Sequence, residues 1–323
     1  ICTIHWLERA DCEFRAAPAS PCPGPMGGVP ELAGTAESLS EDGSLPMAST
    51  VQPEAVRLFV RMMEKPNLEI PLTEAALFIA RTEYPQLDIA TQLDRFRNLA
   101  ARLQLARLAT PWDSIRAINQ LLYAEEGFAG NDDEYDDPRN SYLNDVLDRK
   151  KGIPITLSLV YLEVAKVNGL RVEGVGFPGH FLVKYLTPDQ EIYVDPYHAG
   201  AVLTREDCTE RLRAQYGAEA EMKPEFLAAS TPKQILARML NNLKGSYFRR
   251  RHYERVLTLI EMSLAIDPTS LDPLRDRGMV YLQMNRYREA SADFKAYLSL
   301  CSQDDPGAKD VLHGLRQIQS LMN

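Results

Sequence analysis

Apolar residues recur at intervals of three and four positions through the first part of the chain. From Pro53 to about Leu108 this spacing predicts three amphipathic helices, and a fourth follows from Pro111, where proline suits a first helical turn. The apolar positions of the first three are Ala55, Leu58, Phe59, Met62, Met63, Ala75, Leu77, Phe78, Ala80, Leu93, Phe96, Leu99, Ala100, Leu103 and Ala106. We therefore expect a helical N-terminal region over residues 47–110.

The pattern changes after Gly152. An apolar helix is predicted to Val167, with Pro154 in its first turn and Asn168-Gly169 as its C-cap. Alternating segments then predict strands at residues 172–175, 181–185 and 191–194. A helix followed by a meander of antiparallel strands indicates an α+β domain, which we place at residues 111–230. Thr204 and Asp207 have the spacing of a capping box for a further helix.

The last third of the chain is helical and repeats with a period of 34 residues, which is typical of tetratricopeptide repeats. One copy contains Leu240, Leu243, Tyr247, Val256, Ile260 and Pro268, and a second contains Leu274, Gly278, Tyr281, Ala290 and Phe294. Lys244 departs from the pattern, since it occupies the glycine position of the first copy. We predict repeats over residues 231–323 with a capping helix from Pro306 to Met322, and expect them to dock on the rest of the protein.

Composition is that of an ordinary globular protein, with 45% hydrophobic and 25% charged residues. The net charge of −9 argues against nucleic acid as a partner, because neutralising phosphates needs a basic face. No apolar run is long enough to predict a membrane span. Of the five cysteines, Cys2, Cys12 and Cys22 precede the folded part, and Cys208 and Cys301 lie in different predicted domains. This is no disulfide framework, so we predict a cytoplasmic protein.

Two segments invite a metal-binding interpretation that their spacing does not support. Residues 1–46 are rich in Pro, Ala and Gly, which predicts a disordered extension, and Met47 has the character of a natural start. Its cysteines are about ten residues apart without a nearby pair of histidines. The acidic loop, residues 127–139, lacks the Gly and Glu that a calcium loop needs, so we predict a solvated loop, no metal and no cofactor.

Several motifs resemble the transglutaminase-like (papain-like) core, in particular its bacterial branch with C-terminal tetratricopeptide repeats. They are Gly127-Phe128, Gly130-Asn131, Asn140-Ser141-Tyr142-Leu143-Asn144, Gly152-Ile153-Pro154, Pro178-Gly179-His180-Phe181 and Asp195-Pro196. The resemblance covers roughly residues 50–323. In active members of the superfamily, a Cys opens the helix, a His follows on one strand and an Asp on the next.

This resemblance implies that His180 is the base and Asp195 the acid that orients it. A helix N-terminus would lower the pKa of a thiol at the nucleophile position, but that position holds Pro154, which has no nucleophilic atom. Ser158 lies about 6 Å further along the helix, and Cys208 falls in a later predicted helix, so neither is a ready substitute. Alternatively, His180 and Asp195 are a purely structural pair.

Two hypotheses follow. The first is a non-catalytic adaptor or assembly factor that binds a protein or peptide through the repeats. The second is a hydrolase or amide-processing enzyme in which His180 and Asp195 activate water. Candidate binding residues are Asn140, Tyr142, Ser158, Arg250 and Arg251. The last two belong to a basic cluster, Arg249–Arg255, which would suit an acidic peptide or simply be a solvated loop between helices.

Overall fold

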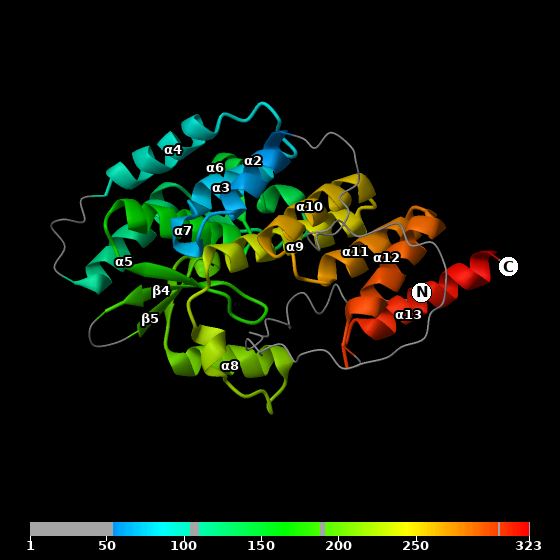
Figure 1. Ribbon diagram of the computed structural model, residues 1–323. Helices are drawn as coiled ribbons and strands as arrows, with labels where there is room; N and C mark the ends of the chain where they lie inside the picture. The colour runs from blue at the N-terminus through cyan, green and yellow to red at the C-terminus, as the bar shows by residue number, and fades with distance from the viewer. Residues whose placement is uncertain (1–53, 104–109, 188–190, 303, 323) are drawn as a thin grey trace.

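The computed structural model describes residues 54–103, 110–187, 191–302 and 304–322 (Figure 1). The predicted extension over residues 1–46 lies outside these ranges. Within them, no helix combines the length and the apolar character needed to cross a bilayer.

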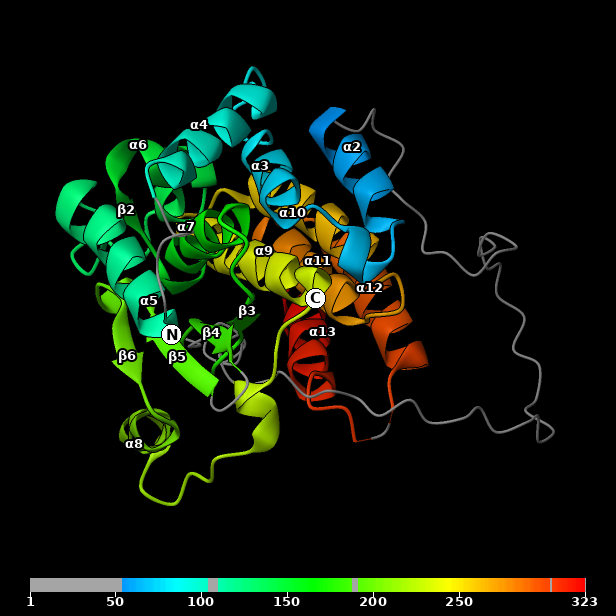
Figure 2. The same cartoon turned by 90° about the vertical axis from the view of Figure 1, so that its left-hand side faces the viewer.

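Three helices lie where the apolar spacing predicted helices: α2 (Glu54–Met63), α3 (Leu72–Ala80) and α4 (Ile89–Ala101), with a short η1 (Asn67–Glu69) between the first two. Asp88 begins α4, because its Oδ1 accepts the backbone N–H groups of Ala90 (3.0 Å) and Thr91 (3.4 Å). Helices α2 and α3 pack against the C-terminal part of the chain rather than forming a separate body (Figure 2).

The next segment is irregular and holds short elements. They are α5 (Pro111–Asn119), η3 (Gln120–Glu125), β1 (Ala129–Gly130), η4 (Pro138–Asn140), α6 (Leu143–Arg149) and β2 (Lys151–Gly152). Helix α5 confirms the fourth predicted helix, and Thr110 Oγ1 caps it by accepting the N–H of Asp113 at 3.2 Å. The π-helical turn η3 was not predicted, since its composition does not differ from that of an α-helix.

Helix α7 (Pro154–Val167) is the centre of the core, and most of its side chains are buried. It begins at Pro154 and ends at Asn168, followed by Gly169 at φ 75°, as predicted. Thr156 Oγ1 accepts the N–H of Ile153 at 3.1 Å and donates to the carbonyl of Asn140 at 2.7 Å, which fixes the start of the helix.

A four-stranded antiparallel sheet packs on α7. Its order is β3 (Val172–Val175), β4 (Leu182–Leu186), β5 (Glu191–Asp195) and β6 (Ala201–Leu203), of which the last was not predicted. Val183 pairs with Val194, and both belong to the main core with α7. Leu182 and Tyr193 point to the other face, where they pack with α8 (Arg205–Tyr216) and η6 (Pro224–Leu227). The sheet is thus buried on both faces.

Two helical hairpins and a capping helix complete the chain: α9 (Pro232–Arg249), α10 (Tyr253–Ile266), α11 (Asp272–Gln283), α12 (Tyr287–Leu300) and α13 (Ala308–Met322). Gly278 lies against the ring of Phe294, and a Cβ there would be 2.5 Å from that ring. Lys244, at the matching position of the first hairpin, instead forms a buried ion pair with Asp276 at 2.7 Å. Side chains of α9 and α10 share one core with α7 and the N-terminal helices, which confirms that the repeats dock and that the fold is α+β.

Candidate functional site

Asp195 ends β5 and is held in place by the turn that follows it. Its Oδ1 accepts the backbone N–H groups of Tyr197 (3.1 Å) and His198 (3.4 Å), and Pro196 begins the short helix η5 (Pro196–His198). The side chain is fully buried, with 0% exposed. Backbone N–H groups therefore hold the carboxylate in position independently of the side chains that contact it.

His180 reaches this carboxylate from the turn before β4. Gly179 adopts φ 64°, and the N–H of His180 donates to the carbonyl of Phe177 at 3.0 Å, which makes the turn tight. His180 Nε2 lies 2.8 Å from Asp195 Oδ1, and 14% of the histidine side chain is exposed. The structure thus brings together the two residues that the resemblance implied.

Two further residues contact Asp195, and the sequence analysis missed both. His198 Nδ1 lies 2.7 Å from Asp195 Oδ2, and the guanidinium of Arg211 in α8 forms an ion pair with the same oxygen. The side chain of His198 is 55% exposed. His198 follows Asp195 by three residues across a Pro-containing turn, a spacing that could have revealed it. Nothing in the sequence places α8 beside β5.

These donors determine the charge of Asp195. Burial by itself would raise the pKa of the carboxyl, but hydrogen bonds from His180, Arg211 and His198 outweigh it and hold the pKa well below its usual range. Asp195 is therefore a carboxylate at neutral pH and is suited to orient an imidazole or to bind a cation.

The position where a nucleophile would open α7 holds the buried ring of Pro154. Ser158, one turn along, is fully buried, and its hydroxyl donates to the carbonyl of Phe181 at 3.4 Å. Cys208 packs in α8 among apolar side chains, and burial raises the pKa of its thiol to about 11. Its thiol is therefore protonated at neutral pH, which makes it a poor nucleophile.

Comparison with known proteins agrees with this arrangement. Residues 88–241 match the model of the transglutaminase-like superfamily, and residues 243–313 match a tetratricopeptide repeat model. A UPF0162 protein of Xylella fastidiosa (strain Temecula1) is 36% identical over 241 residues, spanning 72% of this chain and 84% of the relative. The chain belongs to the bacterial transglutaminase-like family that carries C-terminal tetratricopeptide repeats.

More distant relatives share the same region. A UPF0162 protein of Vibrio cholerae is 28% identical over 241 residues, spanning 74% of this chain and 88% of that protein. F-box only protein 21 of Pongo abelii is 29% identical over 216 residues, which cover 63% of this chain and 34% of that protein. The family core therefore also occurs within a longer protein.

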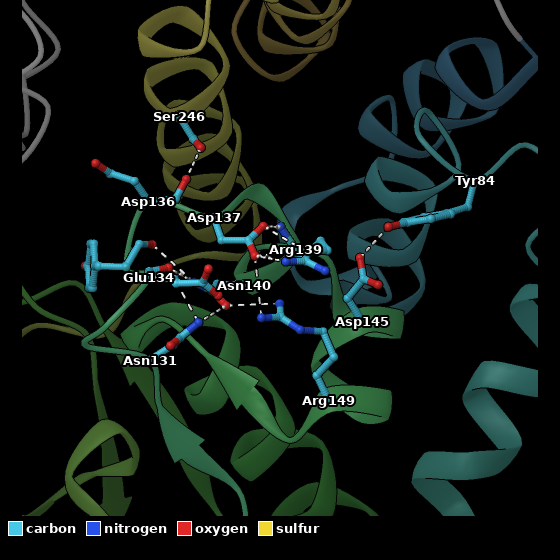
Figure 3. A network of polar contacts seen from close by, with 11 residues as sticks. Tyr84, Asn131, Glu134, Asp136, Asp137, Arg139, Asn140, Asp145, Arg149 and Ser246 are labelled. Carbon is cyan, nitrogen blue, oxygen red and sulfur yellow. Dashed lines mark hydrogen bonds and ion pairs between the residues drawn. The ribbon is translucent and has the colours of Figure 1, made fainter.

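Within the family core, Asn140 lies inside a network of polar contacts (Figure 3). Its Oδ1 accepts from Asn131 Nδ2 at 3.0 Å and from Arg149 at 3.2 Å, and its Nδ2 donates to the carbonyl of Glu134 at 2.7 Å. The residue is 0% exposed. Its amide holds the acidic loop in this structure, and a role in binding a partner stays a prediction.

Tyr142 links the core to the repeats. Its hydroxyl lies 2.9 Å from that of Tyr247 in α9, and its ring meets the edge of Tyr84 with centroids 5.9 Å apart. It is buried, with 2% exposed, so it contacts other parts of the chain rather than solvent. Its proposed binding role likewise stays a prediction.

The acidic loop is not fully solvated, so that prediction was wrong for part of it. Asp137 is buried and pairs with Arg139 at 2.6 Å and with Arg149 at 3.5 Å. Asp136, which is exposed, forms an ion pair with Arg249 and accepts a hydrogen bond from Ser246 at its carbonyl (Figure 3). The loop thus joins the core to α9.

The basic cluster divides into two groups. Arg249 pairs with Asp136, and Arg255 pairs with Glu83 of the N-terminal region at 2.7 Å, so both bind other parts of the chain. Arg250 and Arg251 are exposed. Arg250 also lines a small recess of about 210 Å³ beside Tyr84 and Tyr247.

A larger cavity of about 780 Å³ lies between the core and the repeats. From the core it is lined by the acidic loop, by Ile153 and Pro178, and by the segment around η6; from the repeats it is lined chiefly by α9 and α11. Ile153 precedes the nucleophile position and Pro178 precedes His180 by two residues. His180 and Asp195 themselves do not line it, so the cavity lies beside the dyad rather than over it.

One group of side chains among the described residues has the composition of a metal site. His180, Asp195 and His198 each offer a ligand atom, and these atoms lie within 4.8 Å of one another. Two imidazoles and a carboxylate are ligands that zinc and related ions prefer.

Proposed function

We propose that the protein is a non-catalytic adaptor that binds an extended segment of another polypeptide in the cavity between the core and the repeats. The observation that carries this proposal is the cavity itself, because both family domains contribute to its lining. Its volume of about 780 Å³ falls within the usual range for binding sites, roughly 300–1,000 Å³.

The lining favours a polar chain over an apolar ligand. Asn241 and Asn242 project from α9 into the cavity, and neither side chain forms a hydrogen bond with another described residue. A carboxamide offers both a donor and an acceptor, which match the N–H and C=O groups of a peptide backbone. Two of the cations in the lining, Arg249 and Arg275, already have acidic partners, so the two amides are better placed than these guanidinium groups to recognise a peptide.

The position of Pro154 supports binding over catalysis. Acyl transfer in this superfamily needs a thiol at the start of the helix, and the two substitutes that the sequence offered have unsuitable surroundings. Ser158 donates to the backbone, and Cys208 is buried with a raised pKa. The groups that remain, His180 and Asp195, can take up or orient a proton, but they offer no thiol for the acyl transfer of this superfamily.

Affinity capture from a bacterial lysate, read by quantitative mass spectrometry, tests the adaptor. Asn241→Arg places a long cation in the cavity at an exposed position of α9, so the fold should persist while a genuine partner is lost. Gln283→Arg is the matched control, because it adds the same side chain at an exposed position of α11 outside the cavity lining. A partner that both variants retain equally would contradict binding in the cavity.

The basic cluster is a second surface that the same experiment examines. If the double variant Arg250→Ala/Arg251→Ala loses the partner while Asn241→Arg retains it, the binding surface lies at the end of α9 and not in the cavity. We expect the opposite result, since Arg250 faces the smaller recess on the side of Tyr84.

The rival function, a hydrolase that activates water, is favoured by one observation. His180 Nε2 and Asp195 Oδ1 are 2.8 Å apart, and the ring of His180 is partly exposed, as a general base requires. Hydrolysis of a panel of peptide, amide and ester substrates would support this rival only if turnover disappears in the His180→Ala variant.

A further inference from the structure

His180 and His198 contact opposite oxygens of one buried carboxylate. His180 Nε2 is 2.8 Å from Oδ1 of Asp195, and His198 Nδ1 is 2.7 Å from Oδ2. The acyl-transfer arrangement needs only one imidazole at the acid, so His198 has no role in it. We propose that His180, Asp195 and His198 form a binding site for a divalent metal ion of the zinc class.

The spacing of the ligand atoms fits an ion of this size. A tetrahedral ion that holds its ligands at about 2.0–2.1 Å separates them by roughly 3.4 Å. The three candidate atoms here are 2.7 Å apart at the closest printed contact and within 4.8 Å of one another overall. To reach that separation, each imidazole nitrogen would move about 0.6–0.7 Å away from the carboxylate oxygen that it now contacts at 2.8 or 2.7 Å. Asp195 can stay in place because backbone N–H groups hold its carboxylate.

The proton balance is simple, because each imidazole can ligate in its neutral form. The nitrogen that faces Asp195 would donate its lone pair to the metal, and its proton would be carried on the other ring nitrogen. Asp195 would bind as a carboxylate and supply the negative charge. No oxidation or reduction is involved.

The surroundings provide access and support. The side chain of His198 is 55% exposed, so an ion can enter from solvent, and three protein ligands leave a fourth position open. Tyr197 packs edge-on against both imidazoles, with ring centroids 6.0 Å from His180 and 5.2 Å from His198. Its hydroxyl donates to Asp132 at 2.6 Å, which fixes this wall of the site. Two imidazoles favour zinc, copper, nickel or iron over calcium and magnesium.

The positive charge of Arg211 should weaken the binding of a cation at Asp195, and this effect can be tested. The guanidinium of Arg211 pairs with Oδ2 of Asp195, so it orients the carboxylate but also places a positive charge beside the metal. Arg211→Gln keeps a hydrogen-bond donor on α8 and removes that charge. Because like charges repel at this range, the variant should bind the ion more tightly than the wild type, by roughly tenfold or more.

Titration of the full chain with Zn²⁺ by calorimetry, and with Co²⁺ by absorption spectroscopy, tests the site. We expect the wild type to bind one metal ion. Removing a residue that only supports a ligand typically lowers metal affinity by roughly 10–100-fold, and His198→Ala should lower it by more, because His198 is itself a proposed ligand. His252→Ala is the matched control, since it removes an exposed histidine elsewhere and should leave this ion bound.

Two outcomes would overturn the proposal. If His198→Ala and His252→Ala change Zn²⁺ binding equally, the metal is held by surface groups. If Arg211→Gln weakens binding or leaves it unchanged while no His198-dependent Co²⁺ band develops, the cluster is a hydrogen-bonded pair of imidazoles. Partner capture through the cavity is measured without added metal, so its failure and the failure of this site are distinguishable.

Discussion

The dyad region and the cavity differ in what they hold. At Asp195 three basic side chains, those of His180, His198 and Arg211, converge on one fully buried carboxylate, but the position for a reactive atom is filled by Pro154. The cavity between the core and the repeats has space and the amides of Asn241 and Asn242, which form no hydrogen bond with another described residue, and several of its charged side chains form ion pairs. The titratable groups and the cavity thus lie in different parts of the molecule. For this reason we propose that the cavity, rather than the region around Asp195, binds a partner.

The difference also concerns what each region contributes to stability. The groups around Asp195 are interdependent, since one oxygen serves His198 and Arg211 and the other serves His180 and the backbone. The cavity wall is built from helices whose inner faces are already packed, so its exposed residues can change at little cost. We therefore expect mutations around Asp195 to lower the free energy of unfolding much more than mutations at exposed positions of the cavity wall.

The largest effect is expected for Asp195→Ala, which leaves Arg211 and two imidazoles without their acceptor. Removing one partner of a buried charged network costs about 3–5 kcal/mol in the free energy of unfolding. Asp272→Ala at the cavity rim is the control, because its ion pair with Arg275 is exposed on the Asp272 side (64%) and should contribute about 0–1 kcal/mol. Urea denaturation of both variants measures the difference, and equal losses would erase the contrast.

An intermediate effect is expected on acidification, from the buried pair on the cavity wall. Burial would raise the pKa of Asp276, but Lys244 and Arg275 outweigh burial and lower it. Since the unfolded chain binds the proton more readily, this stabilisation is present above the ordinary carboxyl pKa of about 4 and is lost as the pH falls through the folded value.

Lys244→Met/Asp276→Leu removes both charges and isolates this contribution. Because pH 3 lies about 0.9 units below the ordinary Asp pKa of about 3.9 and one unit corresponds to about 1.4 kcal/mol, the wild type should lose up to about 1.2 kcal/mol more stability than the double variant between pH 7 and pH 3. Chemical denaturation at both pH values measures it. A double variant with the same pH dependence as the wild type would show that Asp276 does not titrate in this way.

The smallest effect is expected where the repeats meet the N-terminal helices at the surface. Arg255→Ala breaks an ion pair with Glu83 whose side chains are 45% and 24% exposed, and should cost about 0.2–1 kcal/mol, decreasing with salt. Arg250→Ala, which breaks no described ion pair, should leave the unfolding midpoint unchanged. A larger loss for Arg250→Ala would reveal a structural role for the cluster beyond the contacts described.

Sequence alone predicted those features that depend on local pattern. The start of α7 at Pro154, its end at Gly169, and the 34-residue register that places Gly278 against Phe294 all follow from spacing and backbone preference. The meeting of His180 with Asp195 followed from the family resemblance. Each of these depends on residues whose neighbours are close in sequence or fixed by a known motif.

Features that depend on packing between distant segments were not predictable. Arg211 reaches Asp195 only because α8 packs beside the sheet, and Asp136 meets Arg249 only because the repeats dock on the core. The buried position of Asp137 was missed because its partners Arg139 and Arg149 are revealed only by the folded loop. The cavity has the same origin, since neither the core nor the repeats form it alone.

The proposed non-catalytic role requires that no reactive nucleophile lies beside His180. Intact-mass spectrometry of the protein after treatment with acylating and alkylating probes tests this directly, in the wild type and in His180→Ala. We predict the same labelling of thiols and hydroxyls in both proteins, because no thiol or hydroxyl of the described residues forms a hydrogen bond with this histidine. A label that forms only in the wild type, and that maps to Ser158 or Cys208, would contradict the account.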